Sequence, residues 1–188
     1  MDLNFKCGFW HPFGPHAGED PDPILDRKRS EIKRIPNGWT LWSFRHRKSL
    51  DLWRSMLPKS RPVYVLCSDS PKAQDPQTPP LYARFFRSGS HKVFRPIPRG
   101  VSVPHPSTAA GLGSAFVVDK VINFDADETR PHFGVRWFCV ETSKWRTDNL
   151  PTRGEYLVRT PGPVRTRSIY AVLRLRPPYI VEISTSAG

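Results

Sequence analysis

The chain has 188 residues, enough for one domain and few for two. A hydrophobic content of 38% excludes a disordered chain, and 21 prolines, about 11% of the residues, disfavour a helical bundle and favour short strands joined by stiff loops. Lysine and arginine total 29 against 17 acidic residues, a net charge of +12, and arginine dominates the cations. A small, arginine-rich basic domain most often binds a polyanion, commonly nucleic acid; a basic surface kept only for solubility is the simpler alternative.

The cysteines and the apolar runs indicate the cellular compartment of the protein. Cys7, Cys67 and Cys139 lie far apart beside apolar neighbours, without a CxxC pair, so we expect buried, reduced thiols. The N-terminal residues lack a signal-peptide pattern, and no apolar run approaches the roughly 20 residues needed to span a bilayer. The sequence therefore predicts a cytoplasmic protein without a membrane partner, and it does not indicate an oligomeric state.

The N-terminal half predicts two short helices among strands. Asp22 can cap an amphipathic helix ahead of Pro23, and Pro36-Asn37-Gly38 ends it. Its apolar stripe faces inward, and its cations, Lys28 among them, cover the remaining faces. Residues 3–14 are expected to begin as a strand and end in a turn broken by glycine and proline. The other elements expected here are strands at 39–45 and 62–68, the last buried on both faces, and a helix at 50–57.

The C-terminal half predicts strands and loops. Residues 87–114 combine serine, glycine, proline and histidine with little periodicity, so we expect a long flexible loop. Strands are expected at 81–86, 115–124, 132–141, 154–159 and 168–183, the last interrupted by Pro177-Pro178. Two helices and about seven strands make a single α+β domain over residues 1–188, with a curled mixed sheet or a small β-barrel.

Two stretches without carboxylates are the clearest charge feature. The first lies between Asp75 and Asp119, and the second covers residues 156–181. Cations spaced through loops can follow a phosphate backbone, although a solvated positive face with distant carboxylate partners would look the same. The residues predicted to contact a nucleic-acid backbone are Arg45, Arg47, Arg84, Arg87, Lys92, Arg95 and Arg99; the second stretch carries Arg159, Arg165, Arg167, Arg174 and Arg176.

Aromatic residues indicate where a base could stack. Trp39 and Trp42 fall on opposite faces of one strand, so we expect one in the core and the other against a base. Ser43 and the arginines that follow favour Trp42 for the base. Trp10 and His11, in a turn-rich segment, complete the predicted base-binding set of Trp10, His11, Trp39, Trp42 and Ser43.

Catalysis has weaker support. His11 and His16 could act as acid and base on a phosphodiester, or could be turn histidines that face solvent. The chain has no metal-ligand spacing, P-loop, GxSxG or CxxC motif, so we expect no metal and no cofactor. Binding of DNA or RNA is favoured over two alternatives: a nuclease or nucleoside amidohydrolase using the same cleft, and an adaptor whose proline-rich loop binds another protein.

The order of the segments also resembles a known superfamily. WTLWSF lies between two short helices, and GLGSAFVVDKVINF is followed by WFCVE and LPTRGEYLVR. This order resembles the PUA-like superfamily, with its EVE, YTH and ASCH branches. The resemblance implies a compact, curled β-barrel with flanking helices that binds RNA or DNA, in several members through a modified base held in an aromatic pocket. The lysine, threonine and glutamate set of the ASCH branch is absent, so the resemblance implies recognition without hydrolysis.

Overall fold

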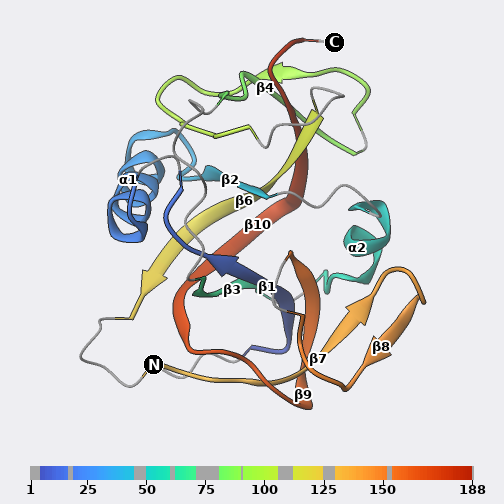
Figure 1. The fold of residues 1–188 in the computed structure, drawn as a ribbon. Coiled ribbons are helices and arrows are strands. Elements are labelled where there is room, and N and C mark those ends of the chain that lie inside the picture. The colour runs from blue at the N-terminus through green and yellow to red at the C-terminus, as the bar shows by residue number, and fades with distance from the viewer. Residues whose placement is uncertain are drawn as a thin grey trace.

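A computed structural model describes residues 5–16, 19–44, 50–59, 62–70, 81–89, 91–105, 112–124, 130–151 and 154–187. These ranges contain two helices and ten strands (Figure 1). The helices are α1 (Pro21–Arg34) and α2 (Leu50–Met56). The strands are β1 (Cys7–Phe13), β2 (Thr40–Phe44), β3 (Val63–Asp69), β4 (Phe85–Ser88), β5 (Arg95–Pro96), β6 (Leu112–Asn123), β7 (Gly134–Cys139), β8 (Lys144–Arg146), β9 (Tyr156–Arg165) and β10 (Ile169–Ser184).

All ten strands belong to one curled, mixed sheet, which confirms the predicted α+β class. Hydrogen-bonded neighbours follow the order β2-β6-β10-β3-β1-β9-β7-β8, and a β4–β5 hairpin joins the C-terminal end of β10. The β1–β3 pair is parallel. The sheet is open, because β2 and β8 end the path without pairing to each other in the described part of the chain. The small closed barrel, expected as the alternative, is therefore wrong.

The middle strands β1 and β3 are covered on both faces. Alternation along β1 places Phe9 and Phe13 in one apolar cluster, together with side chains of α1 and α2, and Trp10 in a second cluster on the other face. Val65 and Leu66 of β3 divide between the same two clusters. This burial confirms that residues 62–68 form a central strand. A third cluster lies beneath the β4–β5 hairpin.

Strand β10 is long because it bends. Residues 169–175 pair with β3 and residues 181–184 with β4, while β6 follows both parts with a register shift between Leu175 and Ile180. Pro177 and Pro178 lie in that shift, and neither can donate a ladder hydrogen bond. The strand continues through this point, so the predicted interruption is a shift of register and not a break.

Helix α1 differs from its prediction at two points. It begins at Pro21 with Asp20 as N-cap, two residues earlier than expected, because a first turn leaves amide groups unpaired and so accommodates both prolines. It ends as predicted, since Asn37 and Gly38 take φ angles of 69° and 61°. The expectation that Lys28 faces solvent is wrong, because the lysine is 3% exposed and donates to Glu31 at 2.8 Å.

Two short strands, β5 and β8, were not predicted, because they have too few residues for a periodic signal.

The strand expected at 81–86 is displaced to β4, and Tyr82 makes only an isolated bridge to Pro104. A strand pattern of a few residues cannot fix its own register, so its bounds depend on the partner strand.

The predicted loop at 87–114 is described except for Ser90 and residues 106–111. Within it, Val103 is 1% exposed, and the Ser102 amide donates to Glu31 Oε1 at 3.0 Å. Residues 101–105 are thus tied to α1 and to the third cluster, and the flexibility of the whole segment stays a prediction.

The structure also bears on the expected burial of the cysteines and on the expected lack of a segment that spans a bilayer. Cys7, Cys67 and Cys139 are free and buried, and burial raises the pKa of the first two thiols. Neither α1 nor α2 is long and apolar enough to cross a bilayer.

Candidate nucleic-acid interface

The β4–β5 hairpin, taken with the residues directly beside its strands (84–99), carries most of the cations predicted to contact phosphates. Arg84, Lys92, Arg95 and Arg99 are exposed, and none forms an ion pair with a described residue. Arg87 is different: it pairs with Glu182 of β10 at 2.6 Å and lies 4.6 Å from the ring of Phe94. Four of the five predicted cations here are available to an anion and one is used within the fold. Arg45 and Arg47 lie outside the described residues.

An aromatic pair joins this hairpin to the residue before β2. Trp39, partly exposed just before β2, packs against Phe86 of β4 with ring centroids 5.7 Å apart. Phe86 is directly opposite Arg95 in the β4–β5 register, and cross-strand partners point to the same face. The structure therefore groups a cation with aromatic surface at this place.

Trp42 is not at that surface. It is 5% exposed in the first cluster, while Leu41 lies in the third, so the predicted alternation of the strand is correct. The sequence favoured Trp42 for a base, whereas the burial makes Trp39 the accessible tryptophan of the two. Ser43 is half-buried on the Leu41 face, away from Trp42.

His11 is the middle member of a buried chain of two hydrogen bonds. The Trp42 indole donates to His11 Nε2 at 3.3 Å, and His11 Nδ1 lies 3.1 Å from Glu155 Oε1. Because an indole can only donate, Nε2 is the unprotonated nitrogen, and the proton on Nδ1 is donated to the carboxylate. Both ring nitrogens thus have partners inside the fold, and an acid–base role would require one of these contacts to break. His16, in the following loop, makes a backbone bridge with Glu19.

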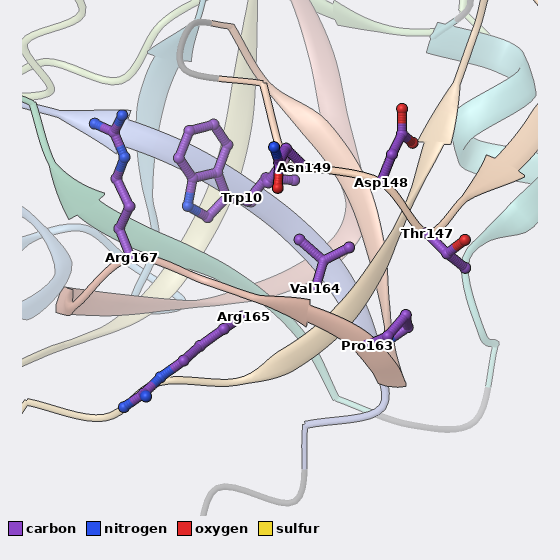
Figure 2. Close-up of a pocket in the computed structure, with 9 residues that line it drawn as sticks. Trp10, Thr147, Asp148, Asn149, Pro163, Val164, Arg165 and Arg167 are labelled. Carbon is purple, nitrogen blue, oxygen red and sulfur yellow. The ribbon is translucent and has the colours of Figure 1, made fainter.

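Trp10 lies on the opposite face of the sheet from His11. It lines a hollow of about 500 Å³ between the β8–β9 loop and the β9–β10 turn (Figure 2). The remaining lining residues are Thr147, Asp148, Asn149, Leu150, Pro163, Val164, Arg165 and Arg167. The predicted base-binding residues are therefore not gathered in one pocket: Trp39, Trp42 with His11, and Trp10 occupy three separate places.

Trp10, one of the lining residues, carries an unpaired donor. Trp10 is fully buried, and its Nε1 has no hydrogen-bond partner among the described residues. A buried unpaired donor costs about 1–3 kcal/mol. At the rim, Asp148 accepts two hydrogen bonds from Arg146, at 2.9 and 2.5 Å, which lower the pKa of its carboxyl.

Arg165 and Arg167 were not among the residues predicted to contact a nucleic-acid backbone. They belong to the second acid-free stretch, whose other arginines are used within the fold. Arg174 pairs with Asp119 at 2.7 Å, and Arg159 donates to the Met56 carbonyl and lies 4.6 Å from the Trp145 ring. The acid-free stretch was a usable signal, but only the fold shows which of its arginines remain exposed.

Comparison with known proteins found no match: neither a family model, nor a curated protein, nor a solved structure corresponds to this chain.

Proposed function

We propose that the protein binds nucleic acid, DNA or RNA, and that the β4–β5 hairpin is its main contact surface. The observation that carries the proposal is the set of four exposed cations without carboxylate partners among the described residues: Arg84, Lys92, Arg95 and Arg99. Unpaired cations on one surface element neutralise phosphates without competition from internal ion pairs.

Aromatic groups beside these cations support the same proposal. Tyr82 is 49% exposed two residues before Arg84, and Trp39 is partly exposed against Phe86. Bases stack on such rings irrespective of sequence, so the surface suits a single strand or an unpaired loop. A PUA-like identity remains part of this proposal and rests on the order of the sequence segments alone.

A salt titration of oligonucleotide binding tests the proposal. Each of Arg84→Ala, Arg95→Ala and Arg99→Ala should weaken binding similarly across sequences and reduce the slope of log K against log salt by about one unit. Arg34→Ala is the matched control, because Arg34 is exposed on α1, far in sequence from the hairpin, and its Nε donates to the Ser30 carbonyl of the same helix. If the three hairpin variants keep the parental slope, the hairpin is only a solvated surface.

A further inference from the structure

The hollow beneath the β8–β9 loop is a second basic site, remote from the hairpin. Figure 1 shows the hairpin strand β4 near the C-terminus and strands β7 to β9 at the other end of the molecule. Arg165 and Arg167 line the hollow, are exposed and form no ion pair with a described residue. The one carboxylate in its lining, Asp148, is already paired with Arg146. The hollow therefore carries net positive charge.

Three groups at this site are hydrogen-bond donors without an ion pair or a hydrogen-bonded side chain among the described residues: the guanidinium groups of Arg165 and Arg167 and the Trp10 indole N–H. The two guanidinium groups have no acceptor atoms, and the Trp10 indole nitrogen can only donate. A ligand for this site must supply several acceptor oxygens and negative charge. A phosphate group meets both conditions and matches the fork of a guanidinium.

The size and walls of the hollow indicate more than a phosphate ion. Its volume is about 500 Å³, within the range of sites for small organic ligands. Leu150, Pro163 and Val164 give it apolar walls. A ligand with a phosphate on one side and a flat, weakly polar body on the other fits this division.

We propose that the hollow lined by Trp10, Arg165 and Arg167 binds a nucleoside phosphate, either a free mononucleotide or the phosphorylated end of a nucleic-acid strand. Arg167 holds the phosphate, Arg165 adds positive charge at the rim, the apolar walls hold the base, and the Trp10 indole donates to an oxygen of the ligand. The site does not depend on the hairpin.

Access to the indole requires a small rearrangement. In Figure 2 the Arg167 guanidinium stands on one side of the Trp10 ring and Asn149 on the other, while the Arg165 side chain extends away from them. Arg167 and Asn149 are both exposed, so their side chains are free to change rotamer and admit a ligand to the Trp10 ring. The ligand then supplies the acceptor that this nitrogen lacks.

The test is an NMR titration of the indole N–H signals in ¹⁵N-labelled protein. Adenosine, cytidine, guanosine and uridine 5′-monophosphates should shift the Trp10 signal, assigned with Trp10→Phe, more than the Trp42 signal, because the Trp42 indole already has a partner. Adenosine and inorganic phosphate should bind at least roughly 10-fold more weakly than the monophosphates, since each lacks half of the ligand. Arg167→Ala should weaken monophosphate binding at least roughly 10-fold, and Arg34→Ala should leave it unchanged.

The arms of the experiment separate the two sources of the ligand and the two sites. An oligonucleotide with a 5′-phosphate that shifts the Trp10 signal, where its 5′-hydroxyl counterpart does not, identifies a strand end; a shift with mononucleotides alone identifies a free nucleotide. The Arg84→Ala/Arg95→Ala/Arg99→Ala variant should still bind mononucleotides as the parent does. The proposal is overturned if no monophosphate moves the Trp10 signal, if inorganic phosphate binds as tightly as the monophosphates, or if Arg167→Ala binds them normally.

Discussion

Helix α1 and the β4–β5 hairpin each carry five cations, yet within the described residues α1 pairs three of them with carboxylates and the hairpin pairs one. On α1, Lys28 is buried and pairs with Glu31, and Arg29 pairs with Asp26 at 2.6 Å. On the hairpin, four cations remain exposed and unpaired within the described residues, and only Arg87 finds a carboxylate. The difference follows from the acids: α1 contains its own, whereas the hairpin lies in a stretch that has none.

The contrast distinguishes structural charge from charge available to a partner. The Glu31 carboxylate is 1% exposed and accepts from Lys28, Thr40 Oγ1 and the Ser102 amide, so it joins α1 to β2 and to the segment after β5. A buried charge with several partners fixes neighbouring elements in place. Exposed cations on the hairpin add little to folding and remain free for phosphates.

The largest expected effect is on stability, from removing one partner of the buried pair. Lys28→Met should destabilise the protein by about 3–5 kcal/mol, because it leaves the Glu31 carboxylate buried without its cation. Arg87→Ala is the comparison, since Arg87 and Glu182 are 29% and 30% exposed, and it should cost about 1 kcal/mol or less. Urea unfolding measures both.

Lys28→Met/Glu31→Gln sharpens the same comparison. Removing both charges should recover part of the stability lost in Lys28→Met, because no unpaired ion remains in the interior. Equal stability losses in Lys28→Met and Arg87→Ala would show that the two regions hold their cations equally loosely.

Trp42 in β2 and Trp39 just before it provide an effect of similar size. Trp42→Ala should cost about 3–5 kcal/mol of stability, because it removes a buried side chain and leaves His11 without a donor. Trp39→Ala should cost less stability but about 1–3 kcal/mol of oligonucleotide affinity.

Thermal melts and oligonucleotide titrations of the two variants, measured side by side, separate these roles. If Trp39→Ala binds as tightly as the parent, the aromatic part of the hairpin surface has no role in binding.

How far the sequence could predict this structure depends on the length of each pattern. The helix α1, the buried strand β3 and the alternation of β2 follow from local periodicity, and each is confirmed. The burial of Lys28 could not be predicted, because one of the two acceptors of its ammonium group, the Ser102 carbonyl, lies 74 residues away in the sequence. The grouping of Trp10, His11 and Trp42 in one pocket failed for a related reason: adjacent residues of a strand face opposite sides, so Trp10 and His11 separate once β1 is central.

A pH effect on stability separates the buried lysine from the exposed ones. Burial lowers the pKa of Lys28 from 10.5 to about 8, although Glu31 opposes the shift. Between these two values the unfolded chain holds the proton and the folded chain does not, so raising the pH stabilises the folded state. The stability of the parent should therefore rise relative to Lys28→Met as the pH passes from 8 toward 10.5.

Denaturant midpoints of the two proteins across that pH range provide the measurement. A difference that stays constant with pH would mean that Lys28 keeps its proton in the folded protein.

The smallest effect concerns mobility within the segment after β4. The Ser102 amide donates to Glu31 Oε1, and the His105 amide donates to the Leu81 carbonyl at 2.5 Å, whereas Val93 is 71% exposed at the hairpin tip. Amide exchange at Ser102 and His105 should therefore be at least roughly 10-fold slower than at Val93. Glu31→Gln tests the cause, because a neutral amide is a weaker acceptor and should accelerate exchange at Ser102 more than at His105. Fast exchange at all three amides would mean that the whole segment is mobile and that the contact with α1 does not hold it; slow exchange at Ser102 and His105 alone would confine the mobility to the cationic tip, where a bound strand could order it.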